Sequence, residues 1–395
     1  MNFKLRIIVA GLIAQYPIGG VTWDYLQYVL GLARLGHDVY YLEDSGQWPY
    51  NPIEGGLGKD GKYNASYLSD IMERFDLSEN WAYHFPGGEL PSGDVFPGHW
   101  YCHSEKRRVD FIESADLLIN VSSGIGEPVT YRKIPHLAYV DTDPVFTQIK
   151  VLNDSGFREH IDTHDVHFSY GECISDSGPA TGHQWHPIRK PIVLSEWHPS
   201  AARRDIFTTV MNWTSYKDVT YSGKNYGQKD SEFMRFVDLP DRVSPTVLEI
   251  ALGGGNTRQA PREQLIKKGW QLVEPMNVCP DLDSYRDYIE SSKAEWTVAK
   301  HGYVVGQVGW FSGRTACYLA AGRPVVVQDT GFSSVLPVGE GILKFRTMDE
   351  AADAIREVAA NYSQHSNVAR DIAGEYFDSD KLLSKLIETA MDNTN

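Results

Sequence analysis

The stretch Gly309-Trp-Phe-Ser-Gly-Arg-Thr-Ala-Cys-Tyr-Leu-Ala-Ala-Gly-Arg-Pro-Val-Val-Val-Gln-Asp-Thr-Gly-Phe332 predicts a loop, a helix, a tight turn, a buried strand and a second loop. Ser312 suits the N-cap of a short helix over residues 315–321, and Gly322 suits the left-handed position after it. The next proline stops the helix, and three valines from Val325 are typical of a strand buried on both faces of a parallel sheet. The stretch therefore predicts one αβ unit of an α/β protein.

The start of this helix has the features of an anion site. Its free N–H groups and dipole attract negative charge, and Arg314 adds a cation that can bind a diphosphate. An ordinary αβ unit with a solvated arginine would have the same sequence pattern. The stretch alone leaves both interpretations open.

Length and composition restrict the class of protein. A chain of 395 residues exceeds what one hydrophobic core usually organises, so two domains are expected. The net charge of −15 argues against nucleic acid or an anionic membrane as the main partner. Four widely spaced cysteines without a CxxC pair favour reduced thiols in a cytoplasmic protein. The apolar run at residues 5–14 is too short to span a bilayer, and no signal-peptide cleavage region follows it.

The N-terminal half begins with a βαβ unit. Residues 5–10 and 37–42 are expected strands, and residues 22–35 an apolar-striped helix between them. The first turn contains Gly19 and Gly20 but lacks the GxGxxG spacing of dinucleotide folds. A nonredox α/β domain is therefore expected.

Three further strands in this half, at residues 115–121, 136–140 and 166–170, end in small or acidic polar residues. Ligands of open parallel sheets bind outside the carboxyl ends of the strands, so these ends should line a cleft. Residues 46–101 are rich in Gly, Pro, Trp and Tyr and are expected to form long loops with one helix near residues 67–75. Their aromatic side chains suit either a sugar or planar acceptor or a packed loop core.

No metal site is expected. His160, His164 and His167 lie close together in the sequence, but their spacing matches no HExxH motif. They are interpreted as unconnected surface histidines on a loop that enters a strand.

The C-terminal half repeats the α/β plan after a proline-rich crossover near residues 186–199. Its strands include residues 207–211 and residues 246–252, the latter ending in three glycines where backbone could approach a ligand closely. We expect an N-terminal Rossmann-like acceptor domain over residues 1–195 and a C-terminal donor domain over residues 196–375. Residues 376–395 are expected to form a helix that can cross back to the first domain.

This plan resembles the GT-B architecture of many glycosyltransferases, in which two Rossmann-like domains face each other across a cleft. The run from Ser312 to Val326, followed by Thr330 and Gly331, resembles their donor-binding end. It is most similar to the group that contains the spore-maturation protein CgeB. The resemblance implies transfer of a sugar from a nucleoside diphosphate sugar to an acceptor hydroxyl, without a metal or other cofactor.

The resemblance also implies roles for particular residues. The implied donor-binding residues are Gly254, Gly255, Asn256, Ser312, Gly313, Arg314, Thr315, Asp329, Thr330 and Gly331. The residues expected at the acceptor cleft are Gly19, Gly20, Glu43, Ser123 and Glu172.

One departure from the family pattern bears on the mechanism. Many retaining GT-B enzymes have two glutamates eight positions apart, where this chain has Gly309 and Cys317. Inversion is therefore expected, and it needs a general base from the N-terminal domain. Asp141 and Asp143 are the first candidates. The candidates that follow are Asp24, Glu43 and Glu172, and each of these carboxylates could instead have a capping or salt-bridge role.

Two other functions remain open at this point. A sugar-nucleotide epimerase of the same fold would close the same cleft on one ligand. A noncatalytic sugar-nucleotide-binding protein would have the donor site alone.

Overall fold

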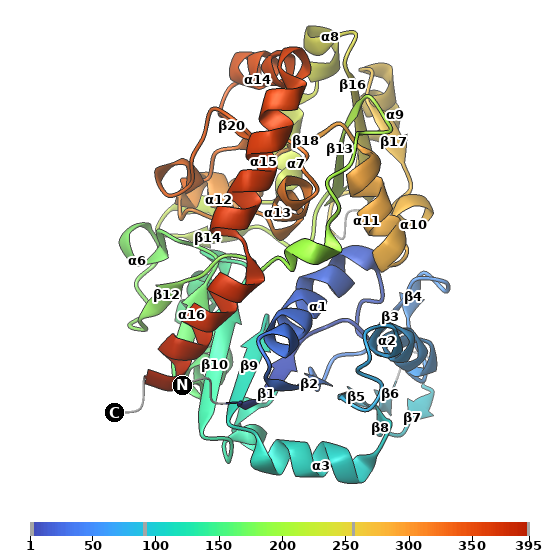
Figure 1. Cartoon of the computed structure of the whole chain (residues 1–395), viewed down its shortest axis with the longest axis vertical. Helices are drawn as coiled ribbons and strands as arrows, with labels where there is room; N and C mark the ends of the chain where they lie inside the picture. Colours follow the sequence, from blue (N-terminus) through green and yellow to red (C-terminus); the bar gives the residue numbers. More distant parts are fainter. Residues whose placement is uncertain (1–3, 90–92, 255–256, 393–395) are drawn as a thin grey trace.

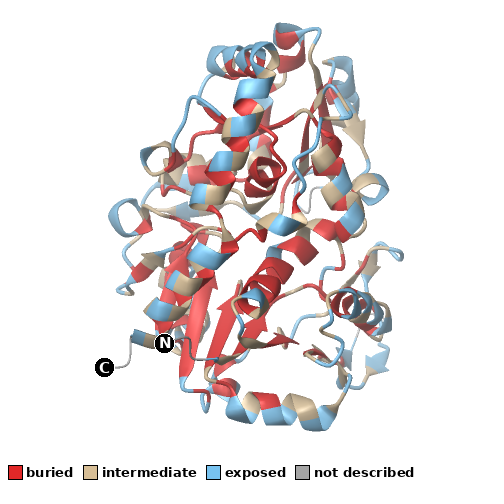
Figure 2. Ribbon diagram, in the orientation of Figure 1, coloured by how far each residue is buried: buried red, intermediate tan, exposed pale blue. Residues whose placement is uncertain are grey.

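A computed structural model describes residues 4–89, 93–254 and 257–392 (Figure 1). Two sheets lie one above the other along the long axis of the molecule, and helices cover the faces of both. The strands form the buried layers, and the exposed residues lie on the outer helices and hairpins (Figure 2). No helix within this described part is long and apolar enough to cross a membrane.

The N-terminal sheet has eight strands in the order β12-β11-β10-β9-β1-β2-β5-β8. All of its neighbours pair in parallel except β5 and β8. Its strands are β1 (Arg6–Ala10), β2 (Asp38–Glu43), β5 (Trp81–Phe85), β8 (His99–Cys102), β9 (Leu117–Val121), β10 (His136–Asp141), β11 (Val166–Ser169) and β12 (Trp185–Pro187). From β5 to β11, this is the Rossmann order 3-2-1-4-5-6, so the order reverses between β1 and β9.

The C-terminal sheet has six parallel strands in the order β17-β16-β13-β18-β19-β20. They are β13 (Ile206–Asn212), β16 (Val247–Gly253), β17 (Gln271–Val273), β18 (Ala294–Thr297), β19 (Val325–Gln328) and β20 (Ile342–Phe345). The Rossmann order recurs here, and the reversal falls between β13 and β18. Two Rossmann-like units in sequence confirm the predicted fold class.

Helices connect the strands and cover the sheets. In the first half they are α1 (Gly19–Arg34), α2 (Lys62–Arg74), α3 (Glu105–Ser114), α4 (Phe146–Asn153), α5 (Ser155–Asp162) and α6 (Ile174–Ser177). In the second half they are α7 (Lys229–Phe233), α8 (Leu239–Val243), α9 (Arg262–Lys267), α10 (Pro275–Val278), α11 (Leu282–Ser291), α12 (His301–Gly306), α13 (Gly313–Ala320), α14 (Met348–Ala360), α15 (Tyr362–Tyr376) and α16 (Ser379–Asp392). Short 3-10 turns are η1 (Pro128–Tyr131), η2 (Leu194–Glu196), η3 (Met234–Phe236) and η4 (Phe332–Ser334).

Helix α1 begins at the glycine pair, three residues before the expected start. Ile18 is extended at the N-cap, and the hydroxyl of Thr22 donates to the Ile18 carbonyl within the first turn. A Cβ on Gly19 would lie 2.0 Å from the carbonyl oxygen of Asp281, so the close approach of the second half of the chain requires glycine here. The start of α1 is therefore pressed against the C-terminal half.

Residues 46–101 are more ordered than the sequence indicates. They contain α2, the sheet strands β5 and β8, and the hairpins β3 (Tyr50–Asn51) with β4 (Gly56–Leu57) and β6 (Gly88–Glu89) with β7 (Val95–Phe96). A third hairpin, β14 (Val219–Tyr221) with β15 (Lys224–Tyr226), lies in the second half. Trp48 packs edge-on against Phe85 and Phe96, which shows that part of the aromatic content forms a local core.

An apolar cluster extends across both halves, and separate clusters lie within each half. The largest apolar cluster includes Trp23 of α1, Tyr318 of α13 and Leu383 of α16. Helix α16 runs down from the upper half and packs on α1 and β10 of the N-terminal sheet (Figure 1). The predicted boundary at residue 195 falls in η2, but a shared core sets no sharp border, and the predicted domain limits stay predictions.

Candidate active site between the two sheets

A cavity of about 850 Å³ lies between the carboxyl ends of the two sheets. It reaches the points where both strand orders reverse, because Val121 at the end of β9 and Val210 in β13 line it. Open α/β sheets bind ligands at these points. The cavity also has the volume of an ordinary small-molecule site, so it is the candidate active site.

Helix α13 contributes its N-terminus to the upper wall of the cavity. Ser312, Gly313 and Arg314 line the wall, and Ser312 is the N-cap, as the sequence predicts. The guanidinium of Arg314 is not free: Nε lies 2.6 Å from Oε1 of the fully buried Glu295, and a second nitrogen donates to Thr297 at 2.9 Å. Arg314 is therefore held rigidly, and Glu295 balances its charge.

Two lysines that the sequence analysis did not select complete the cationic wall. Lys300, three residues after the end of β18, lines the cavity, and its Nζ lies 3.0 Å from Oδ1 of Asp143. Lys229, at the start of α7, also lines it, and within the described residues no carboxylate lies within ion-pairing distance of it. Burial first, and then the nearby Arg314 and Lys300, lower the pKa of Lys229 well below its usual range. Lys229 is the cavity cation with the least balanced charge.

Asp24 is the exposed carboxylate of the opposite wall. It lies in the otherwise buried middle of α1, and its side chain is 55% exposed. Oδ1 lies 3.1 Å from Nζ of Lys190, which is almost completely buried beneath it. A Cβ on Gly313 would lie 3.2 Å from the same Oδ1, so Asp24 packs directly against the start of α13 at the edge of the cavity.

Asp141, a predicted base, lies off the cavity and is completely buried. Its carboxylate accepts hydrogen bonds from Thr147 at 2.6 Å, Ser169 at 2.8 Å, Gln148 at 3.0 Å and the Asp143 N–H at 2.9 Å. Burial raises its pKa above the usual range, although these bonds oppose the shift. Through these hydrogen bonds, Asp141 holds the turn after β10 in its conformation.

Asp143, the other predicted base, joins the two halves of the chain. Its carboxylate contacts Lys300 and accepts hydrogen bonds from the hydroxyls of Tyr216 and Tyr303, all in the C-terminal half. It does not line the cavity, whereas Lys300 and Tyr303 do. Asp143 therefore holds the side chain of Lys300 in position.

The residues predicted at the acceptor cleft are dispersed. Gly20 lines the cavity and Gly19 packs on Asp281. Glu43 is buried beneath the loop before α1 and accepts bonds from Tyr41 and the Ala14 and Gln15 N–H groups; burial raises its pKa to about 7. Ser123 bonds Tyr139 at 3.2 Å, and its neighbour Ser122 lines the cavity instead.

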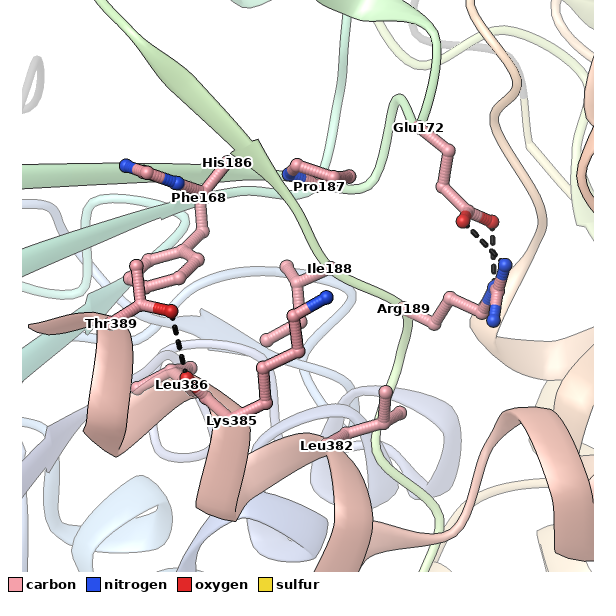
Figure 3. A pocket seen from close by; sticks show the side chains of 10 residues that line it. All are labelled: Phe168, Glu172, His186, Pro187, Ile188, Arg189, Leu382, Lys385, Leu386 and Thr389. Atoms are coloured by element: carbon pink, nitrogen blue, oxygen red, sulfur yellow. Dashed lines mark hydrogen bonds and ion pairs between the residues drawn. The ribbon is translucent and has the colours of Figure 1, made fainter.

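Glu172 lies at a second, smaller hollow of about 220 Å³ beside α16. Figure 3 shows its carboxylate directed at Arg189, whose Nε lies 2.6 Å from Oε1. This ion pair belongs to the crossover between the two halves, since Arg189 also donates to the carbonyl of Val335.

Apart from Gly254, the remaining predicted donor residues that the structure describes do not line the cavity. Gly254 lines the cavity, while Gly255 and Asn256 fall outside the described residues. The carboxylate of Asp329 is completely buried; although burial opposes the shift, bonds from Ser333, the Gly331 N–H and Arg346 hold its pKa below the usual range. Thr315 and Thr330 are buried, and the Thr330 hydroxyl donates to the Trp310 carbonyl.

Comparison with solved structures defines the fold. HepE from Anabaena with UDP-glucose superposes with a TM-score of 0.59 at 12% identity, over 98% of this chain and 99% of that one. An α-glucosyltransferase solved with UDP and a 13-mer DNA containing an HMU base gives 0.56 at 11% identity, over 98% and 100%. No family model and no curated protein matches the chain.

A third structure carries a different activity in its name. A Listeria monocytogenes protein designated a UDP-N-acetylglucosamine 2-epimerase gives a TM-score of 0.51 at 12% identity, over 100% of this chain and 98% of that one. Together with the strand orders, these likenesses confirm the GT-B fold.

Proposed function

We propose that the protein is a glycosyltransferase that transfers a sugar from a nucleoside diphosphate sugar to an acceptor hydroxyl. The observation that carries the proposal is the convergence of Lys229, Lys300, Arg314 and the start of α13 on one cavity wall. A diphosphate gains negative charge as its bond to the sugar breaks. Fixed cations and free backbone N–H groups aimed at that position stabilise the developing charge.

The three cations differ in what they can offer to the donor. Glu295 and Asp143 already balance Arg314 and Lys300, so these two provide hydrogen bonds in a fixed geometry. Lys229 has no such partner within the described residues, and a bound diphosphate would raise its lowered pKa. We therefore assign to Lys229 the largest share of donor affinity.

The same arrangement favours Asp24 as the general base, ahead of Asp141 and Asp143. An inverting transfer needs a base within reach of the acceptor hydroxyl, on the side of the sugar away from the leaving group. Asp24 is exposed in the cavity beside the start of α13, whereas Asp141 is buried and Asp143 is held by three partners. We propose that Asp24 takes the proton, that Lys190 holds its orientation, and that protein cations carry the charge of the leaving group.

A panel of nucleoside diphosphates tests the donor site. A ligand present at a hundred times its Kd stabilises the native state by about 2.7 kcal/mol, which thermal unfolding detects. UDP is the first compound to test, because HepE and the α-glucosyltransferase were solved with it. We expect one nucleoside diphosphate to raise the melting temperature, and a flat response across the panel would overturn the proposal.

A sugar-nucleotide epimerase is the second candidate, favoured by the structural likeness to the Listeria protein. It would convert the donor alone, whereas a transferase needs an acceptor. NMR of the sugar nucleotide after incubation without acceptor separates the two: an epimerised donor excludes the transferase. A donor that binds but is never consumed with a broad acceptor panel identifies a binding protein.

Several finer assignments stay predictions. They are the likeness to the CgeB group, the cytoplasmic location and the exclusion of nucleic acid as acceptor. One structural neighbour was solved with DNA, but a net charge of −15 opposes binding of a polyanion. Salt-dependent binding to a DNA duplex would contradict that exclusion.

A further inference from the structure

We infer that the acceptor is a neutral, polyhydroxylated molecule: a saccharide without a phosphate or carboxylate at its reacting end. The inference rests on the proposed function and defines the substrate class of the same cavity. Two features of the N-terminal wall carry it, namely its hydroxyl groups and the pairing of its charges.

Ser122 is turned toward the cavity by a tight turn after β9. Ser122 and Ser123 both have left-handed backbone, with φ of 54° and 62°, which is costly for residues other than glycine. Close packing holds the turn, since a Cβ on Gly124 would lie 2.4 Å from the backbone nitrogen of Gly11. Ser122 consequently lines the cavity and Ser123 bonds Tyr139 away from it.

Ser122 belongs to a chain of hydroxyl groups on this wall. Its Oγ lies 2.5 Å from Oγ1 of Thr142, and Tyr25 lines the cavity beside it. All three residues line the cavity, as does Tyr170, whose hydroxyl lies 2.7 Å from that of Tyr28. Hydroxyls both donate and accept and can rotate, so such a wall matches the mixed donors and acceptors of a sugar.

Tyrosine rings supply apolar faces beside these hydroxyls. Tyr16 and Tyr50 line the N-terminal wall together with Tyr25 and Tyr170. An aromatic ring offers a large, rigid apolar surface and keeps its polar end available for hydrogen bonding. A saccharide, with C–H faces and hydroxyl edges, satisfies both parts of this wall.

The charges of the wall disfavour an anionic acceptor. Of the described residues that line the cavity from the N-terminal half, only Asp24 and Lys190 are charged, and they pair with each other at 3.1 Å. A phosphate or carboxylate here would meet the Asp24 carboxylate and find no free cation. Lys229, which has no carboxylate partner within the described residues, lies on the opposite wall, where the donor diphosphate would occupy it.

The test uses the full chain and the sugar nucleotide that the donor panel identifies. We would measure kcat/KM for neutral mono- and disaccharides, for the corresponding sugar phosphates and uronic acids, and for simple phenols. Neutral saccharides should exceed their anionic counterparts by at least about tenfold, the value of one charged interaction. Equal or better use of the anionic forms, or transfer to phenols alone, would overturn the inference.

Single variants locate the effect on the wall. Ser122→Ala should raise the acceptor KM by about five- to tenfold and leave the donor KM unchanged. Ser123→Ala, with the same left-handed backbone but a side chain off the cavity, should change neither. An equal response of both variants would show that the turn, rather than the Ser122 hydroxyl, matters.

A charge introduced on the same wall should alter the preference. In Thr142→Lys, kcat/KM for a sugar phosphate relative to its neutral sugar should rise by about tenfold. An unchanged ratio in a folded variant would count against this acceptor position. Failure of the proposed function looks different, because no nucleoside diphosphate would then bind and no donor would be consumed with any acceptor.

Discussion

The two walls of the cavity carry different side chains and suit different ligands. The C-terminal wall presents Lys229, Lys300, Arg314 and the start of α13, a set suited to a diphosphate. The N-terminal wall presents tyrosine rings, the Ser122–Thr142 hydroxyls and one carboxylate, Asp24, that pairs with a buried lysine. Both walls come from sheets of the same strand order. The fold therefore supplies the position of the cavity, and the side chains of the surrounding strand ends, loops and helices decide what each wall can bind.

The largest expected effect concerns the carboxylate of the N-terminal wall. Asp24→Asn removes the proton acceptor with almost no change in shape, so kcat should fall by about 10²- to 10⁴-fold while the donor Kd stays within about twofold. Steady-state kinetics and calorimetric titration of the nucleoside diphosphate measure the two quantities. Asp162→Asn removes a similarly exposed, paired carboxylate on α5 and serves as the control. A kcat close to that of the wild type would return the role of base to another residue.

The next effect concerns the cationic wall. Lys229→Met keeps most of the apolar volume but removes the unbalanced charge, so the donor Kd should rise by about 10- to 100-fold. Lys267→Met, on the exposed surface of α9, should leave the Kd unchanged. If both variants bind donor like the wild type, the diphosphate lies elsewhere in the cavity.

The sequence predicts the strands and helices around the cavity better than it predicts the residues that line the two walls. The αβ unit at residues 309–332 and the first βαβ unit follow from local signals: apolar runs, caps and glycines. Those signals depend on near neighbours in the chain, and the structure has both units. Strands β5 and β8 lie in an irregular aromatic segment without clear alternation, so the periodicity did not reveal them.

The site residues show what local sequence patterns cannot predict, namely which side chains reach the cavity. Asp141 follows a strand, as expected of a cleft residue, but three side-chain donors and one N–H bury its carboxylate. Asp24 lies inside a helix, where sequence gives no sign that it is the exposed position of a buried element. Lys300 could have been found, since it lies three residues after the end of β18 and the strand-end rule applies there too. Lys229 could not, because a loop of sixteen residues separates it from β13.

A smaller effect tests whether Asp141 supports the N-terminal wall or acts in catalysis. Asp141→Asn places an amide group next to donors whose hydrogen bonds the carboxylate accepts in the wild type. This mismatch should lower the free energy of unfolding by about 1–3 kcal/mol. Because Thr142 follows it directly, the acceptor KM should rise, while kcat at saturating acceptor stays near that of the wild type. Urea unfolding and steady-state kinetics measure both. A loss of kcat like that of Asp24→Asn, with unchanged stability, would make Asp141 the base.

The smallest expected effect is a pH dependence of donor affinity, which should arise from the C-terminal wall alone. Burial and neighbouring cations hold the pKa of Lys229 well below its usual range in the free protein, and a bound diphosphate would raise it. Donor affinity should therefore be constant at low pH, fall as pH rises through the pKa of the free protein, and level off above the pKa of the complex. The slope cannot exceed tenfold per pH unit for one proton. Calorimetric titration of the nucleoside diphosphate across this range measures it.

Two variants test whether the titration of Lys229 causes the pH dependence of donor affinity. Lys229→Arg keeps a charge that does not titrate, so the affinity should become nearly independent of pH and exceed that of the wild type at alkaline pH. Lys229→Met should also lose the slope, but at a uniformly weaker affinity. If the slope survives in both variants, the proton belongs to another group of the cationic wall, and Lys300, tied to Asp143 at 3.0 Å, would be the next to replace. Ser122→Ala should retain the full slope, since the N-terminal wall does not contact the diphosphate in the proposed arrangement.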